Sequence, residues 1–434
     1  MAYDQWMHRT NFENRRRLES LHAEPLAAYQ LERLNDLLAN ILPGNRFYAD
    51  KLGSVSLPLT SLEQLTELPY TFKEELVSGE RGSELAANLT HEPDRYVRLH
   101  RTSGTHGRPM IVMDTAEDWQ WWLNTWQFVL DAAGVEGSDR AFMAFSFGPF
   151  IGFWSAYDAL VSRGALVVPG GGMDTLARIE LIRACRANVL CCTPSYALHM
   201  AEIARENQVD PAKLPVDRII VAGEPGGSQP SIRQRIEQTW EARLIDHSGA
   251  TEVGPWGYGS VDGAGLYLVE SEFIAEFLSV ETGQPAGEQE LSELVLTTLG
   301  RHGSPVIRYR TGDLVRPTWN RPGSNRFVFL EGGVLGRADD MLVIRGVNVF
   351  PSSVEQILRS FPEVVEYRII ACRSGEMDAL RVQVEDRLNH VERIEKELKL
   401  RLGLRVPVET VPLGTLPRFE GKGKRFIDER PRRF

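Results

Sequence analysis

A short glycine-rich stretch, RTSGTHGRP from Arg101 to Pro109, gathers the residue types that proteins use to hold an anion. Glycines let the backbone come close to a ligand, hydroxyl groups donate hydrogen bonds, and an arginine adds positive charge. The stretch does not match the G-x-x-x-x-G-K-[ST] loop of the common nucleotide triphosphatases. From these residues alone, a phosphate-binding loop and an ordinary glycine-rich turn account for the composition equally well.

Further short motifs follow along the chain: GEP at 223–225, SGATE at 248–252, YRTGD at 309–313, GRADD at 336–340 and GK at 421–422. Together with the glycine-rich stretch, they occur in the order of the core motifs of the adenylate-forming superfamily. The chain most resembles the phenylacetate–CoA ligase branch, through LPYTFKEEL, TPSYALHMAEIA, TTLGRHGSPVIRYRTGDLV, DDMLVIRGVNVFPSSVE and LPRFEGKGKRFID. The resemblance covers residues 46 to 428, which is almost the whole chain.

The resemblance implies an ATP-dependent acid–thiol ligase. Such an enzyme adenylates an aromatic carboxylic acid, aryl or arylacetic, and releases pyrophosphate. It then passes the acyl group to coenzyme A (CoA), which gives a thioester and AMP. ATP, Mg²⁺ and the co-substrate CoA are therefore expected. Two alternatives stay open: an enzyme that passes the adenylate to an amine or to a carrier-protein thiol, and a noncatalytic protein that binds a nucleotide or an aryl acid.

By the same resemblance, the glycine-rich stretch would bind the β- and γ-phosphates of ATP. The residues concerned are Ser103, Gly104, Thr105, His106, Gly107 and Arg108. Arg108 stands where the family usually has lysine, and His106 stands where threonine is common. Thr251 and Glu252 would help to place ATP and Mg²⁺, a cation that needs few protein carboxylates. Asp313 would accept hydrogen bonds from the ribose hydroxyls.

The other nucleotide contacts are expected around the adenine ring and in the GRADD motif. The residues are Gly223, Glu224, Pro225, Asp246, His247, Ser248, Gly249 and Arg337. For Arg337, a salt bridge between domains is the alternative to a position near the nucleotide. Ser248 replaces a tyrosine whose ring packs against adenine in the superfamily. His247 and Trp256 are the candidates to supply the missing ring surface.

The resemblance assigns catalysis to Lys422, together with Thr251 and Glu252. Lys422 would contact both the carboxylate and the α-phosphate during adenylation, a task that suits a flexible point charge; Lys424 is the nearby alternative. In the family, the small domain rotates after adenylation so that a thiol can attack the adenylate. Asp339 matches the hinge of that rotation. Gly346 and Asn348 match the segment that lines the access path of the CoA thiol.

An aromatic-rich segment, FSFGPFIGFW, follows a predicted strand and is the candidate pocket for the acid. The expected lining residues are Phe145, Phe147, Phe150, Trp154, Ala222, Gly223 and His247. Core packing is the alternative use for at least some of these rings, because aromatic side chains dominate hydrophobic cores. An aromatic lining suits an aryl or arylacetic acid better than a long-chain fatty acid.

The hydrophobic pattern predicts the scaffold that must hold these residues. Helical spacing predicts a helix over 26–41, and the alternation of apolar runs with helix-like segments from Ala141 onward predicts a mostly parallel sheet covered by helices. After Gly254 the pattern changes to antiparallel strands. The fold class is therefore α/β: a large N-terminal adenylate-forming domain with mixed, largely parallel sheets, plus a small mobile α+β domain at the C-terminus.

We expect a core domain at 1–335, a hinge at 336–340 and a C-terminal lid domain at 341–434 that carries Lys422. A chain of 434 residues exceeds the length that one hydrophobic core usually supports. Its four cysteines lack the paired spacing of a zinc site. Cys191 and Cys192 lie in an apolar run, so we assign them to a buried strand.

The net charge of −10 argues against broad nucleic-acid binding. No apolar run is long enough to span a bilayer, and the N-terminal stretch lacks the apolar core of a signal peptide. We therefore expect a cytoplasmic protein without nucleic-acid or membrane partners. The family resemblance alone suggests a homodimer.

Overall fold

The computed structural model describes residues 11–53, 55–77, 85–102, 109–152, 154–338, 340, 342–344, 347–374, 377–418 and 425–430. The predicted site residues that lie outside this set are Ser103, Gly104, Thr105, His106, Gly107, Arg108, Asp339, Gly346 and Lys422. Asn348 belongs to a described strand, but its side chain is not described. The roles assigned to these residues stay predictions.

The predicted N-terminal helix is present as α3 (Ala23–Ile41). Leu34, Leu37 and Ile41 are fully buried because helical spacing brings them to one face. The other helices of the N-terminal region are α2 (Phe12–Glu19), α4 (Arg46–Leu52), α5 (Lys73–Leu76) and the 3₁₀ helices Leu62–Glu67 and Pro93–Arg95. The hydrophobic cluster of this region includes Ile274 and Ile307, so the region packs against the antiparallel part of the large domain.

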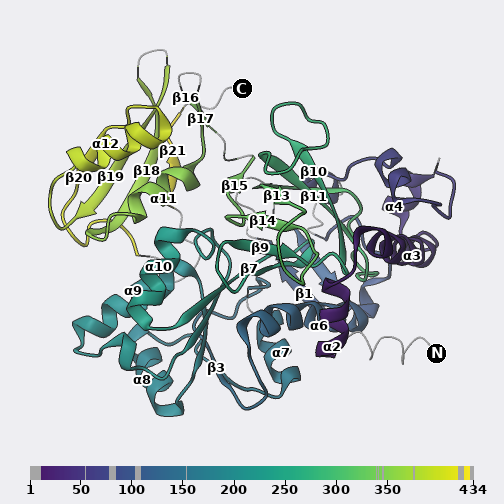
Figure 1. Cartoon of the computed structure of the whole chain (residues 1–434), viewed down its shortest axis with the longest axis horizontal. Coiled ribbons are helices and arrows are strands. Elements are labelled where there is room, and N and C mark those ends of the chain that lie inside the picture. Colours follow the sequence, from purple (N-terminus) through teal and green to yellow (C-terminus); the bar gives the residue numbers. More distant parts are fainter. Residues whose placement is uncertain are drawn as a thin grey trace.

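A nine-stranded mixed sheet forms the centre of the large domain, in the order β13-β14-β9-β8-β7-β6-β5-β3-β4 (Figure 1). Its parallel strands are β3 (Arg140–Met143), β4 (Leu166–Pro169), β5 (Val189–Cys192), β6 (Arg218–Val221) and β7 (Arg243–Ala250). Every residue of β5 is buried, as expected for a strand covered on both faces. The predicted parallel sheet and the core positions of Cys191 and Cys192 are confirmed.

Helices cover both faces of the parallel strands. They are α6 (Ala116–Ala133), α7 (Trp154–Arg163), α8 (Thr175–Cys185), α9 (Pro194–Glu206) and α10 (Pro230–Trp240), with a 3₁₀ helix at Pro211–Lys213. Helices α6 and α7 contribute to one hydrophobic cluster, and α8, α9 and α10 contribute to another. The two groups lie on opposite sides of β3 (Figure 1). This alternation brings the carboxyl ends of the strands, and the loops after them, to one edge of the sheet.

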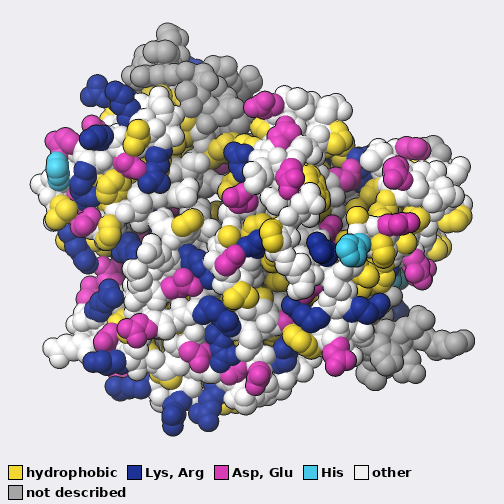
Figure 2. Space-filling model, in the orientation of Figure 1, with side chains coloured by type: hydrophobic (Ala, Val, Ile, Leu, Met, Phe, Trp, Pro, Cys, Tyr) yellow, Lys and Arg dark blue, Asp and Glu magenta, His cyan; other side chains and the backbone are white. Residues whose placement is uncertain are grey.

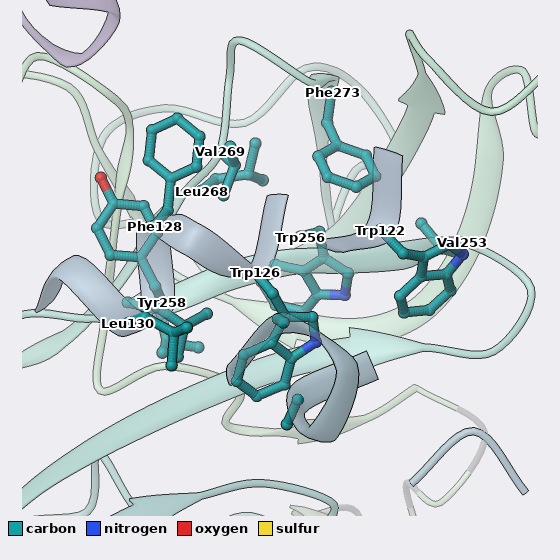
Figure 3. Close-up of a cluster of buried hydrophobic side chains, with 14 of the residues drawn as sticks. Trp122, Trp126, Phe128, Leu130, Val253, Trp256, Tyr258, Leu268, Val269 and Phe273 are labelled. Atoms are coloured by element: carbon teal, nitrogen blue, oxygen red, sulfur yellow. The ribbon is translucent and has the colours of Figure 1, made fainter. Parts of the chain in front are cut away.

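Helix α6 supplies the aromatic centre of the larger cluster. Trp122, Trp126 and Phe128 point from it toward side chains of the antiparallel strands, among them Trp256 and Phe273 (Figure 3). The helix begins at Thr115, whose hydroxyl accepts from the backbone N–H of Asp118, and ends at Gly134, whose φ of 63° favours glycine. The sheet and the antiparallel region therefore share one core.

The strands of the large domain after Gly254 are antiparallel, as predicted. β8 (Gly254–Gly259), β9 (Gly265–Leu268), β14 (Phe329–Glu331) and β13 (Pro317–Thr318) extend the central sheet. A second sheet has the order β10-β11-β12-β15 and consists of β10 (Phe273–Ser279), β11 (Ser292–Thr298), β12 (Tyr309–Val315) and β15 (Gly336–Arg337). A separate pair, β1 (Arg98–Arg101) and β2 (Ile111–Asp114), flanks the glycine-rich stretch in sequence.

The C-terminal α+β unit has its own hydrophobic cluster, which contains described residues from Leu342 to Val408. Its elements are β16 (Leu342–Ile344), β17 (Val347–Val349), α11 (Pro351–Arg359), β18 (Val364–Ser374), β19 (Met377–Asp386), α12 (Glu392–Leu402), β20 (Val408–Thr410) and β21 (Phe426–Asp428). Helix α11 lies over α10 of the large domain (Figure 1).

Acidic and basic side chains are intermixed across the face seen in Figure 2. This distribution agrees with a chain in which 59 acidic residues exceed 49 basic ones without a long run of either sign. Within the described part of the chain, no helix combines the length and the apolar character needed to cross a bilayer.

Candidate active site

The carboxylate of Glu252 is the best-defined charged group at the site edge of the sheet. It follows β7 in a tight turn closed by a hydrogen bond from the N–H of Val253 to the carbonyl of Ala250, at 3.1 Å. The Tyr309 hydroxyl donates to Glu252 Oε1 at 2.9 Å, and Lys73 Nζ lies 3.4 Å from the same oxygen. Burial opposes ionisation, but Lys73, the backbone and Tyr309 outweigh it and hold the pKa of Glu252 below its ordinary value.

Lys73 reaches Glu252 because the segment before α5 docks on the second sheet. The N–H of Thr71 donates to the carbonyl of Arg308, and the N–H of Arg310 donates to the carbonyl of Thr71, both at 2.9 Å. This bridge places Thr71 beside Tyr309, two residues before Lys73. The sequence marked LPYTFKEEL as family-like but assigned no role to its lysine. Only the pairing of residues more than 230 positions apart reveals the contact.

The oxygen donors around Glu252 suit a hard divalent cation that is held mainly by its substrate. Mg²⁺ is usually bound through one or two carboxylates plus phosphate oxygens, and it keeps several waters. In the described ranges, no group of three or more His, Cys, Asp and Glu side chains could hold a metal ion. A single ionised carboxylate at the Glu252 turn therefore fits Mg²⁺ held mainly by phosphate oxygens better than a metal enclosed by protein ligands.

A buried arginine fixes the turn that carries Thr251 and Glu252. Arg301 is fully buried, and its Nη1 donates to the carbonyl of Thr251 at 2.9 Å. Its Nε donates to Asp114 Oδ1 at 2.8 Å, and its guanidinium lies 5.3 Å from the ring centre of Trp122. The backbone before Glu252 is thus tied to β2 through one charged pair.

Arg301→Met is expected to lower the free energy of unfolding by about 3–5 kcal/mol, because the Asp114 carboxylate would stay buried without its cation. Denaturation in urea measures the change. The double variant Asp114→Asn, Arg301→Met removes both charges and should recover part of the loss. A single variant as stable as the unmodified protein would contradict this role for Arg301.

Asp313 and Arg337, both predicted near the nucleotide, are brought together by the pairing of β12 with β15. Arg337 Nη1 donates to Asp313 Oδ1 at 3.1 Å and to the carbonyl of Thr311 at 2.8 Å. Gly312 has a φ of 74°, and a Cβ there would lie 2.8 Å from Arg337 Nη2. Glycine at position 312 therefore permits the positive φ and leaves room for the guanidinium of Arg337.

Asp246 and His247 are both buried in the middle of β7, where its pairing with β6 stops and its pairing with β8 begins. Ser228 Oγ donates to Asp246 Oδ2 at 2.6 Å, and burial raises the pKa of Asp246 to about 6. His247 Nδ1 lies 2.8 Å from the carbonyl of Gly257, and its ring centre is 4.2 Å from that of Trp126. Burial lowers the pKa of His247 to about 4, so the ring is neutral at physiological pH.

The idea that Trp256 supplies the missing adenine-stacking surface is wrong. Its ring is 1% exposed and lies in the aromatic core shown in Figure 3. Strand β8 is buried at every position, so its side chains serve the core and not the ligand edge. Ser248 pairs with Gly257 of β8 and is partly exposed. A side chain at Gly249 would lie 2.9 Å from the carbonyl oxygen of Gly254, so the turn needs glycine.

His247 makes stability depend on pH. Its ordinary pKa of 6.5 applies to the unfolded chain, whereas the pKa in the folded protein is about 4. As pH falls between these values, the unfolded state takes up a proton that the folded state refuses, so the free energy of unfolding should fall by roughly 3 kcal/mol. His247→Asn keeps a donor toward Gly257 and should lose this part of the dependence in urea titrations. The exposed control His390→Asn should keep it, and equal profiles for both variants would contradict the assignment.

The GEP loop follows β6 at the same edge. Gly223 is exposed with a φ of 92°, and Glu224 Oε1 accepts from the backbone N–H of Ser195 at 2.6 Å. Ser195 lies in the first turn of α9, where unpaired N–H groups favour an anion. Pro225 is partly buried. Glu224 therefore caps a helix as well as standing in the predicted adenine region.

Three of the four aromatic residues predicted for the acid pocket pack together. The ring centre of Phe147 is 4.7 Å from that of Phe145 and 4.5 Å from that of Trp154. Tyr157, which the sequence did not single out, lies 5.7 Å from Phe147. Phe150 is instead 52% exposed. Phe147, Trp154 and Ala222 are only partly buried against the main cluster, which leaves ring surface beside the strand ends.

Comparisons with known proteins identify the family of the chain. Residues 50–279 match the AMP-binding enzyme family, and residues 346–430 match the AMP-binding enzyme C-terminal domain. The chain is 31% identical over 433 residues to the phenylacetate-coenzyme A ligase of Pseudomonas putida, an alignment that covers 95% of this chain and 96% of the relative. It is 32% identical over 444 residues to that of Thermus thermophilus, with 95% and 98% covered.

Solved structures of 2-hydroxyisobutyryl-CoA ligase share the fold. In its postadenylation state with 2-HIB-AMP, that enzyme matches with a TM-score of 0.88 at 26% identity, over 95% of this chain and 91% of the other. In its thioesterification state with 2-HIB-AMP and CoA, the TM-score is 0.71 at 26% identity, over 95% and 92%. The domain arrangement seen here is therefore closer to the postadenylation state.

Proposed function

The chain belongs to the AMP-binding enzyme family, and from this premise we propose that it activates an aromatic carboxylic acid with ATP and transfers the acyl group to CoA. The observation that carries the proposal is the ionised Glu252 beside Lys73 and Tyr309, in the turn that follows β7. The acid would be aryl or arylacetic, and the product an acyl-CoA thioester.

The chemistry explains why such a site needs paired charges. A carboxylate is a poor acyl donor, because its leaving group would be oxide. Attack of a carboxylate oxygen on the α-phosphorus of ATP forms a C–O–P linkage and releases pyrophosphate, so AMP becomes the leaving group. Because two anions must meet, electrostatic stabilisation is expected to supply most of the catalysis. Lys73 and Lys422 are the cations proposed for this task.

Within this proposal, Glu252 would hold Mg²⁺, and Thr251 would help to place it. The ion would supply positive charge that offsets part of the charge on the phosphates of ATP. Glu252 suits the task because its carboxylate is kept ionised in a largely buried position. Tyr309 and the turn held by Arg301 fix the direction of that carboxylate. Asp313 would accept from the ribose hydroxyls, with Arg337 beside it.

The aromatic nature of the acid is supported by two observations. The rings of Phe145 and Phe147, in the loop after β3, gather with that of Trp154 at the start of α7. Two relatives at 31–32% identity are phenylacetate-coenzyme A ligases. Aromatic rings contact one another favourably in offset or edge-to-face arrangements. 2-Hydroxyisobutyrate, the branched aliphatic acid of 2-hydroxyisobutyryl-CoA ligase, is the substrate to compare with aromatic acids.

The second half-reaction is proposed to use the thiol of CoA, which attacks the acyl carbon and releases AMP. The C-terminal unit would rotate about Asp339 between the two steps, and Gly346 and Asn348 would border the path of the thiol. A carrier-protein thiol or an amine in place of CoA would leave the first half-reaction unchanged. The nature of the acceptor is therefore a separate question from the adenylation.

One experiment tests both parts. The protein is incubated with ATP, Mg²⁺ and either aromatic acids or 2-hydroxyisobutyrate, with and without CoA, and pyrophosphate release is measured. We expect release with an aryl or arylacetic acid and formation of its CoA thioester. Release that gives a hydroxamate with hydroxylamine but no thioester would indicate another acceptor. No release with any acid, from folded protein that binds ATP, would favour a noncatalytic binding protein.

A further inference from the structure

A polar cavity of about 230 Å³ lies between the helical layer of the large domain and the C-terminal unit. One wall comes from α9 and α10, and the other comes from the end of α11, the start of β18 and the side chains of Arg387, Arg418 and Arg425. Six arginines line it: Arg205, Arg235, Arg359, Arg387, Arg418 and Arg425. The lining carboxylates are Glu202, Glu206 and Glu366.

Four of the six guanidinium groups already bind carboxylates. Arg387 pairs with Glu202 at 2.8 Å, Arg418 with Glu385 at 2.7 Å, Arg425 with Glu366 at 2.7 Å, and Arg359 with Glu355 at 2.8 Å. Arg235, on α10, differs from them. Among the residues that the structure describes, none forms a hydrogen bond or an ion pair with its guanidinium, although its side chain is partly buried.

The charges around Arg235 are mostly of its own sign. Burial and the nearby Arg359 lower the pKa of Arg235 below its ordinary value, and Arg387 and Arg205 act in the same direction. Glu202 opposes them, but its carboxylate is paired with Arg387. Within the described ranges, Arg235 therefore lacks a carboxylate partner of its own. A guanidinium can donate two parallel N–H hydrogen bonds to the oxygens of one phosphate.

We propose that this arginine cavity binds a multiply charged phosphate anion between the two domains, with Arg235 and Arg359 as its main contacts. Because each domain supplies one of these residues, the anion would bind well only when the two walls meet. A ligand shifts a conformational equilibrium by its difference in affinity for the two states, so the anion would stabilise the arrangement seen here. The consequence for catalysis rests on the proposed function: transfer to the thiol would slow, while adenylation would not.

Isothermal titration calorimetry with inorganic pyrophosphate tests the site, and adenosine 3′,5′-bisphosphate forms a second arm. Tighter binding of pyrophosphate would indicate a free inorganic anion, and tighter binding of the bisphosphate would indicate a phosphate carried by a nucleotide. The proposed phosphate loop at 103–108 would also bind pyrophosphate, in the unmodified protein and in each variant. Binding to the arginine cavity would therefore appear as a second event. We expect Arg235→Gln to lower the affinity of this second event by about tenfold or more, because a charge-assisted contact is lost. Arg235→Lys should lie between Arg235→Gln and the unmodified protein.

The matched control is Arg183→Gln, which makes the same change at an exposed position of α8 outside the cavity. It should bind pyrophosphate like the unmodified protein. Identical isotherms for Arg235→Gln and the unmodified protein, or a single binding event in both, would overturn the proposal. Failure of the proposed function would look different: pyrophosphate exchange into ATP would be absent with every acid, whatever residue stands at position 235.

Discussion

Glu252→Gln is expected to lower the rate of acid-dependent pyrophosphate exchange into ATP by about 10²–10³-fold, the effect of removing one preorganised electrostatic group. Glutamine keeps the size of the side chain and an acceptor for the Tyr309 hydroxyl. It removes the charge that faces Lys73 and that would hold Mg²⁺. The exchange rate measured over a range of Mg²⁺ concentrations should therefore show a weaker apparent affinity for the ion as well as a lower maximum.

The matched control for this change is Glu331→Gln, at an exposed carboxylate on β14. It should leave both the rate and the Mg²⁺ dependence unchanged. Circular dichroism and unfolding in urea verify that Glu252→Gln is folded. A folded Glu252→Gln protein with normal exchange would exclude Glu252 from the machinery of adenylation.

Lys422→Ala is expected to divide the two half-reactions. Formation of the adenylate should fall by about 10²-fold or more, because the cation proposed to lie between the carboxylate and the α-phosphate is lost. Attack of CoA on a supplied acyl-adenylate should proceed at a rate close to that of the unmodified protein, since the lysine would have left the site by then. Single-turnover measurements of each step provide the comparison.

The control for this prediction is Lys424→Ala, two residues further along the same segment. If Lys422 is the catalytic lysine, Lys424→Ala should keep most of its adenylation rate. If Lys424→Ala lost its adenylation rate and Lys422→Ala kept it, Lys424 would be the catalytic lysine. Equal losses in both half-reactions for Lys422→Ala would contradict the rotation of the C-terminal unit between the steps.

Much of the fold follows from local sequence patterns. The alternation of apolar runs and helical segments after Ala141 predicted the parallel sheet, because the inner strands of such a sheet are buried on both faces and each helix presents one apolar side. The change of pattern after Gly254 predicted the antiparallel strands. The apolar run around Cys191 and Cys192 predicted a buried strand, and the structure confirms it.

The details that depend on distant residues were not predictable. The apolar pattern after Ala141 predicted a strand before the aromatic segment but not its exact end, which is Met143 in β3. Trp256 looked available to a ligand, but the tryptophans of α6 bury it. A sequence pattern shows which side chains are apolar. It does not show whether a given side chain packs in the hydrophobic core or faces a ligand.

The contacts around Glu252 show the same limit. The motif order marked Glu252, yet Lys73, Tyr309 and Arg301 reach the turn from three other segments of the chain. Lys73 depends on a backbone bridge between Thr71 and Tyr309, and Arg301 depends on a buried partner in β2. Such residues are found only when tertiary pairing is known, because nothing in their local spacing distinguishes them from surface charges.

The central claim is that the acid is activated as an acyl-adenylate, and an isotope measurement tests it most directly. The protein is given ATP, Mg²⁺, CoA and an aryl or arylacetic acid labelled with ¹⁸O in both carboxylate oxygens. The attacking oxygen stays on phosphorus when the thiol displaces AMP, so one ¹⁸O per turnover should appear in AMP by mass spectrometry. Formation of the thioester with unlabelled AMP, or with the label in inorganic phosphate, would contradict the account.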